Sequence, residues 1–212
     1  MKILELTLPS TNLDAQQQVF GGMLGFRNQR VDEQPLEIVV GDSVLRFVSA
    51  ARQFYFHYSF LIPPGCLDSV AAFLDQQGFS PLPLNGQRMV EFACGTAIYF
   101  HDGDQNIAEF IERPSLGHKP IDQFSTAEVI RLNEVGIPAM EPRSFAEQLV
   151  QQYGIEPMSG APNTDDFVWC GDFQGAIIVP RVGRNWIPLE KPAELNELSV
   201  KFKTSGGKFE FA

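Results

Sequence analysis

An internal repeat constrains the fold of this chain more than any other feature of its sequence. Three stretches each begin as a strand, turn at a proline or polar residue, continue as a short amphipathic pattern and stop at a glycine. The opening strands carry one marked polar residue each, namely Glu5, His57 and Glu134. The closing glycine follows after 20, 21 and 20 residues. This pattern predicts tandem copies of one supersecondary unit.

The periodicity within the repeat predicts the element order β-α-β-β-β. Residues 2–8 alternate between two faces as in a strand, residues 13–24 follow a helical stripe, and three strand-like stretches follow before residue 50. The second unit shows the same order. We therefore predict an α+β fold in which tandem βαβββ units form curved mixed sheets around a cavity, with the helices outside.

Residues 1–113 are predicted to hold two units, 1–50 and 51–113, paired around one cavity. Residues 114–126 are polar, contain two prolines and a glycine, and are predicted to be a linker. Residues 127–212 are predicted to be a degenerate third unit with a truncated fourth. This part either packs as a second half of the molecule or mediates a homodimer.

Composition excludes several classes of partner. The formal charge of −10 argues against nucleic acid, which is bound through clustered lysine and arginine. No apolar run is long enough for a membrane span, and no signal peptide is evident, so a cytoplasmic location is expected. The cysteines at 66, 94 and 170 form no C-x-x-C motif, so we expect buried thiols and neither a disulfide framework nor a zinc knuckle.

Three residues are candidates for a metal site. If the first two units pair about a pseudo-twofold axis, Glu5 and His57 face each other across the cavity. Glu109 lies on the last strand of the second unit, and its neighbours Ala108 and Phe110 point the other way. One imidazole and two carboxylates suit a divalent ion such as iron, manganese, nickel or zinc. Buried carboxylates are costly without a cation, so the three assignments depend on one another.

Other residues received different interpretations. Glu134 occupies the same repeat position as Glu5, but the sequence shows no partners for it, and we interpret it as a relic of the repeat. Trp169, Trp186 and Tyr58 are predicted to pack in an aromatic core in preference to lining a pocket.

The sequence resembles the vicinal oxygen chelate superfamily, which includes glyoxalase I, bleomycin-resistance proteins, fosfomycin-resistance enzymes and extradiol dioxygenases. The likeness is carried by the opening LELTL, the strand FHYSF and the segment YFHDGDQNIAE that ends at Glu109. It implies ligand positions at His57 and Glu109, and at Glu5, where many members have histidine. The chain departs from the family at Gly103, where proline is common, and in lacking a carboxylate on the last strand of the first unit.

The resemblance implies a divalent-metal-dependent enzyme of glyoxalase or dioxygenase type that acts on a small oxygen-chelating substrate. Glu5 would serve as a general base if it is not a ligand. Isomerisation, conjugate addition and ring cleavage remain open. The alternative is a non-catalytic protein, like the bleomycin-resistance members, that binds a planar small molecule in a phenylalanine-rich groove.

Overall fold

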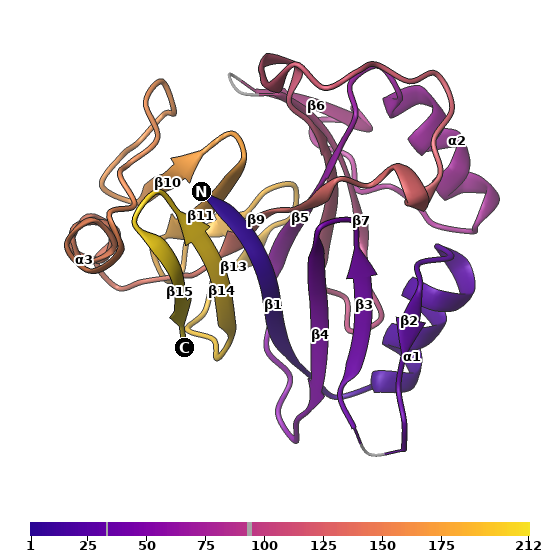
Figure 1. Ribbon diagram of the computed structural model, residues 1–212, viewed down its shortest axis with the longest axis horizontal. Helices are drawn as coiled ribbons and strands as arrows, with labels where there is room; N and C mark the ends of the chain where they lie inside the picture. Colours follow the sequence, from indigo (N-terminus) through magenta and orange to yellow (C-terminus); the bar gives the residue numbers. More distant parts are fainter. Residues whose placement is uncertain (33, 93–94) are drawn as a thin grey trace.

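Two large curved sheets share one apolar core, as the computed structural model shows for residues 1–32, 34–92 and 95–212 (Figure 1). The first sheet has the order β15-β14-β1-β4-β3-β2. Its strands are β1 (Lys2–Ser10), β2 (Asn28–Gln29), β3 (Leu36–Val40), β4 (Ser43–Ser49), β14 (Ser199–Thr204) and β15 (Gly207–Phe211). The α+β prediction with curved mixed sheets is confirmed.

The second sheet is larger and has the order β10-β11-β9-β5-β8-β7-β6. Its strands are β5 (His57–Ile62), β6 (Met89–Phe92), β7 (Gly95–His101), β8 (Ile107–Glu112), β9 (Arg131–Gly136), β10 (Phe167–Asp172) and β11 (Gly175–Pro180). A short hairpin of β12 (Asn185–Trp186) and β13 (Lys191–Pro192) follows. Ala93 and Cys94, the latter one of the three cysteines, lie outside the described residues.

The helices lie at the two sides of the sheets (Figure 1). They are α1 (Leu13–Gln17), which continues as a π-helical turn to Met23, α2 (Leu67–Gln76) and α3 (Pro142–Tyr153). The glycines that close the three repeats, at 25, 78 and 154, all have a left-handed φ of +66° to +82°. That backbone conformation ends a helix and favours glycine, so the stop signals were correctly interpreted. No helix in the described ranges is both long and apolar enough to cross a membrane.

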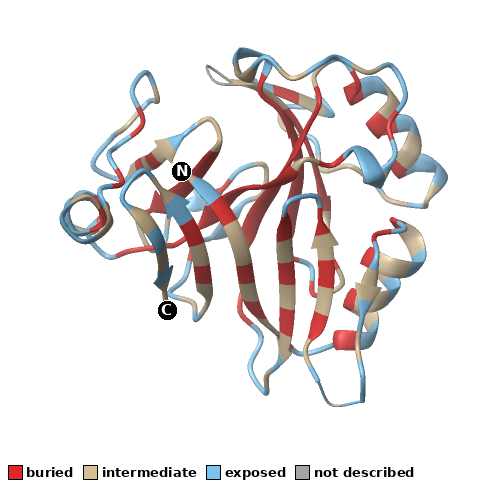
Figure 2. Cartoon of the chain, viewed as in Figure 1, coloured by how far each residue is buried: buried red, intermediate tan, exposed pale blue. Residues whose placement is uncertain are grey.

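The predicted pairing of the first two units is wrong. The opening strand β1 pairs antiparallel with β14, whereas β5 pairs antiparallel with β9 of the third unit. The burial of the strands explains this pairing. As Figure 2 shows, β5 and β9 are buried along their whole length, whereas β1 and β4 alternate between buried and partly exposed residues. Strands buried on both faces belong in the middle of a covered sheet, and alternating strands suit a sheet with one outward face.

Phenylalanine rings join the two sheets. Phe20, from the turn after α1, lies 5.6 Å from Phe47 of β4 and 6.1 Å from Phe60 of β5, measured between ring centroids. Phe60 in turn lies 5.4 Å from Phe110 of β8. All four rings are fully buried. The alternate residues of β5 and β8 point away from this core, and they form the floor of the site described next.

Candidate metal centre

Strand register brings two glutamates to either side of one small residue. On β5, Ser59 pairs with Glu109 of the parallel strand β8 and with Glu134 of the antiparallel strand β9. Residues paired directly across neighbouring strands point to the same face of a sheet, and so does His57, two positions before Ser59. The three ionisable side chains therefore converge over a serine that leaves space between them.

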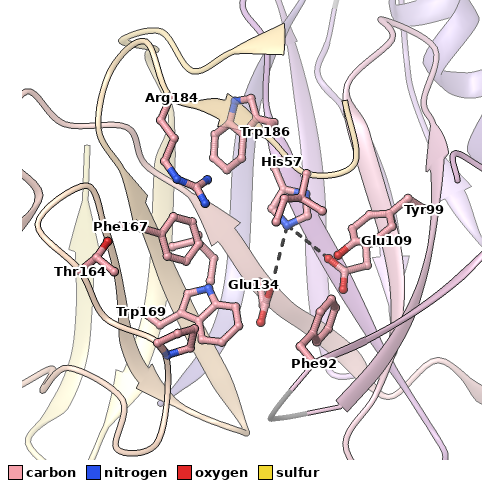
Figure 3. Close-up of a pocket in the computed structure, with 13 residues that line it drawn as sticks. His57, Phe92, Tyr99, Glu109, Glu134, Thr164, Phe167, Trp169, Arg184 and Trp186 are labelled. Carbon is pink, nitrogen blue, oxygen red and sulfur yellow. Dashed lines mark ion pairs between the residues drawn. The ribbon is translucent and has the colours of Figure 1, made fainter. Parts of the chain in front are cut away.

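The three side chains lie within coordination distance of one another. The Nε2 atom of His57 is 3.2 Å from Oε2 of Glu109 and 3.9 Å from Oε2 of Glu134. One possible ligand atom from each residue lies within 4.8 Å of the other two. All three residues are buried. Figure 3 shows His57 above the two carboxylates, which approach it from neighbouring strands.

Burial and mutual contacts perturb the protonation of all three groups. Burial lowers the pKa of His57, but the hydrogen bonds and charges of Glu109 and Glu134 outweigh this effect and raise it to about 9. Burial raises the pKa of Glu109 to about 7, although the hydrogen bond with His57 opposes the change. Burial also acts to raise the pKa of Glu134, but the positive charge of Arg113 prevails and lowers it.

Arg113 fixes the orientation of Glu134. Its guanidinium donates hydrogen bonds to the Glu134 carboxylate and, over 3.1 Å, to Oδ1 of Asn133. This arginine is only 1% exposed. Because Oε1 of Glu134 is bound to Arg113, Oε2 is the atom directed at His57.

The donor set fits a divalent cation. Oε1 of Glu109 and Nδ1 of His57 are buried without a hydrogen-bond partner among the described residues. Buried polar atoms normally have partners, so the unsatisfied carboxylate oxygen indicates a missing cation or water. An imidazole that binds a metal is neutral, so in the metal-bound site the two carboxylates and the cationic Arg113 would leave one net negative charge towards the ion. One nitrogen and two carboxylate ligands suit iron, manganese, nickel or zinc.

The third unit offers no fourth ligand at the equivalent position. In the second unit, Glu109 of β8 pairs with Ser59, two residues after His57. In the third unit, Ile178 of β11 pairs in the same parallel register with Gly136, two residues after Glu134. An apolar side chain therefore stands where a second Glu109 would be. A metal held by three protein ligands keeps coordination positions open for substrate.

A cavity of about 360 Å³ opens over the three residues. Most of its remaining wall is aromatic or apolar: Phe92, Tyr99, Pro162, Phe167, Trp169, Ile178, Trp186 and Ile187. The curvature of the sheet closes it, because Phe92 on β6 comes within 6.5 Å of Trp169 on β10, measured between ring centroids. Burial and the charges of Glu109 and Glu134 raise the pKa of Tyr99 well above 10, so its phenol stays protonated.

The structure separates Glu5 from the other predicted site residues. His57 and Glu109 meet as expected, but Glu5 lies on β1 in the first sheet. Its Oε1 accepts hydrogen bonds of 2.8 Å from both Arg46 and Lys201. The placement of Glu5 as a ligand or general base was wrong because β1 pairs with β14, which carries Lys201, and not with β5. Two cations already neutralise this carboxylate.

Glu134 takes the place that was assigned to Glu5. Its interpretation as a relic without partners is contradicted, since His57 and Arg113 both contact it. The repeat in the sequence had identified Glu134 as equivalent to Glu5. Its role was missed because the first unit, and not the third, was predicted to pair with the second. Among the aromatic residues, Tyr58 packs in the core and donates a 2.6 Å hydrogen bond to Asp102, whereas Trp169 and Trp186 line the cavity.

Comparison with solved structures supports the fold. A Bacillus subtilis protein designated "putative dioxygenase" superposes with a TM-score of 0.62 at 16% identity, and the match covers 85% of this chain and 63% of that one. This chain therefore spans less than two thirds of that protein. Lactoylglutathione lyase from Agrobacterium tumefaciens gives a TM-score of 0.45 at 15% identity, covering 52% and 92%. Fosfomycin resistance protein FosX from Mesorhizobium loti gives 0.39 at 20% identity, covering 51% and 88%.

The superposition on the Bacillus subtilis protein shows that this chain shares the fold of that protein. No family model matches the sequence, and no curated protein matches it. At these identities the likeness concerns the fold, and the chemistry has to be argued from the site.

Proposed function

We propose that the chain is a divalent-metal-dependent enzyme of glyoxalase or dioxygenase type, with His57, Glu109 and Glu134 as the metal ligands. The row Glu109–Ser59–Glu134 beneath His57 is the observation that carries this proposal. When bound, the metal would supply Lewis-acid or redox chemistry to a substrate that offers oxygen ligands.

The residues of the chain have separate roles in this proposal. Arg113 holds Glu134 ionised and fixes its direction. Tyr99 pairs with Glu109 across β7 and β8 and lines the cavity, where its protonated phenol is available to donate a hydrogen bond to a substrate oxygen. The aromatic wall excludes water from the reacting atoms, which strengthens every electrostatic interaction at the site.

Metal analysis tests the proposal. Protein purified without chelators is expected to contain close to one equivalent of a divalent transition metal. His57→Ala and Glu109→Gln should lose it, whereas Glu5→Gln, the matched control, should retain it. A chelator-treated sample should regain thermal stability when iron(II), manganese, nickel or zinc is added, because an ion that binds only the folded state stabilises that state.

Two results would contradict the proposal. One is wild-type protein that neither contains metal nor is stabilised by adding any of the four ions. The other is a His57→Ala variant with wild-type metal content. The first result would leave the non-catalytic binding protein as the better interpretation of the aromatic cavity.

A further inference from the structure

The cavity wall carries one cation whose purpose the metal site does not explain. Arg184 lines the cavity together with Phe167 and Trp169. In Figure 3 these side chains lie on one side of the cavity, across from Tyr99 and Glu109. Phe167 and Trp169 belong to the end strand β10 of the second sheet, whereas Tyr99 belongs to β7, next to the strand at the other end.

The backbone and the ring beneath it fix Arg184 in place. Its carbonyl accepts a 2.8 Å hydrogen bond from the backbone of Ala193, and its own N–H donates over 3.0 Å to the carbonyl of Arg181. The guanidinium carbon lies 4.3 Å from the centroid of the Phe167 ring. A guanidinium stacked on an aromatic face is held in position with its N–H edge free to bind a planar anion.

Arg184 has no acidic partner within ion-pair distance among the described residues. Among the described residues, its one side-chain hydrogen bond is 3.2 Å long and goes to the carbonyl of Asn185. The acid whose charge acts on it, Asp166, is bound to Arg181 over 2.6 Å. Burial lowers the pKa of Arg184, which reflects the low polarity of its surroundings. A partly buried guanidinium of this kind gains strongly from an anionic ligand.

Two tryptophans of the cavity wall carry unsatisfied donors among the described residues. The indole Nε1 of Trp169 is buried and has no acceptor in the described structure. Nε1 of Trp186 is likewise buried without an acceptor among the described residues. The centroid of the Trp186 ring lies 5.5 Å from that of His57. Buried indole N–H groups normally find a partner. The cavity thus combines flat aromatic walls, unpaired N–H donors and one cation, and these features select a planar anion.

We propose that the cavity binds a planar aromatic carboxylate, with its ring between the aromatic walls and its carboxylate paired with Arg184. This inference names the substrate class of the metal centre and rests on the proposed function for the chemistry that follows binding. Carboxylate matches the fork of the guanidinium, which donates two parallel hydrogen bonds. The chain as a whole, with its formal charge of −10, gives no general attraction for anions.

Intrinsic fluorescence reports on this cavity specifically, because Trp169 and Trp186 are the only tryptophans in the chain and both line it. The chelator-treated protein would be titrated with benzoate and with benzamide, which have nearly the same shape but differ by one charge. Benzoate is expected to bind about tenfold more tightly, as a charge-assisted hydrogen-bonded pair implies.

Variants assign the difference to Arg184. Arg184→Met and Arg184→Gln should abolish the preference for benzoate, and Arg184→Lys should keep part of it. Arg143→Met is the matched control, because Arg143 is exposed, pairs with Asp165 and does not line the cavity. Circular dichroism would establish that each variant is folded. Two non-basic replacements keep the test valid if one of them fails to fold.

Three outcomes would overturn the inference: equal affinity of the wild type for benzoate and benzamide, an unchanged preference in a folded Arg184→Met or Arg184→Gln variant, or no fluorescence response to either compound. The proposed function fails separately. A Glu109→Gln variant that has wild-type metal content and still prefers benzoate would refute the metal assignment and leave the Arg184 subsite standing.

Discussion

Removing the guanidinium of Arg113 tests whether the geometry of the metal centre is held by a buried charge pair. Arg113 is 1% exposed and Glu134 is 3% exposed, and the two are ion-paired. In Arg113→Met, the Glu134 carboxylate remains buried, and the one other cationic group within ion-pair distance of it among the described residues is His57, at 3.9 Å. Removing one partner of a buried ion pair typically costs about 3–5 kcal/mol. For a chain of this length, the melting temperature should fall by roughly 10 °C.

The double variant Arg113→Met/Glu134→Gln separates the ion pair from the packing of Arg113, which also stacks 5.7 Å from the Phe173 ring centroid and donates to Asn133. With both charges gone, no uncompensated carboxylate remains. The double-mutant cycle should therefore yield a coupling free energy of about 3 kcal/mol. Urea unfolding of the chelator-treated protein, followed by circular dichroism, measures all four corners of the cycle.

A coupling free energy below about 1 kcal/mol would refute this reasoning, because a value that small is typical of an exposed pair. The metal adds an independent check. Manganese should stabilise Arg113→Met more than the wild type, since the ion replaces the missing positive charge beside Glu134. Equal stabilisation of the two proteins would show that the ion does not contact this carboxylate.

Three further predictions concern other parts of the molecule. Metal-free protein should lose stability as the pH rises from 6.5 towards 9, because His57 binds its proton more tightly in the folded state than in the unfolded state. The loss in the free energy of unfolding is about 3 kcal/mol at most, and urea unfolding at several pH values measures it. A His57→Gln variant with the same pH dependence of stability would contradict this prediction. Glu5→Gln should change the free energy of unfolding by less than about 1 kcal/mol, because Arg46 and Lys201 are partly exposed; a larger loss in urea unfolding would contradict this. Gly136→Ala should weaken benzoate binding and destabilise the fold by about 1–3 kcal/mol, because the added Cβ would lie 2.4 Å from Cη2 of Trp186. Fluorescence titration measures the affinity and thermal unfolding measures the stability. Unchanged affinity and stability would show that the Trp186 ring moves aside freely.

The sequence predicted most of the helices and strands, because strand alternation, helical spacing and glycine stops are local signals. It could not predict which opening strands pair. Glu5 and Glu134 occupy equivalent positions in the repeat, and nothing within a few residues of either one distinguishes them. Their partners do: Glu5 is bound by Lys201, 196 residues away, and Glu134 by Arg113, 21 residues away.

The same limit explains the cavity wall. Trp169 and Trp186 are large aromatic residues of the kind that usually pack in a core. The sequence does not indicate that the second sheet curves so far that β10 approaches β6 and encloses a cavity between them. Tyr58 was placed correctly because it alternates with His57 on β5 and so points to the opposite face. Arg184 was missed altogether. The only signal was a basic residue two positions before a tryptophan in a segment without clear periodicity.

The pairing of β1 with β14 has a consequence for how the protein is made. While the ribosome synthesises the chain, one edge of β1 lacks its neighbour until nearly 200 more residues have been added. An unpaired strand edge is a template for unwanted pairing with other chains. The second and third units, by contrast, can complete their sheet earlier, since β5 and β9 are separated by about 75 residues. The second sheet, which holds the candidate metal centre, can thus form before β14 joins β1 in the first sheet. Contacts between residues far apart in the sequence, such as those of β1 with β14, are the slowest to form.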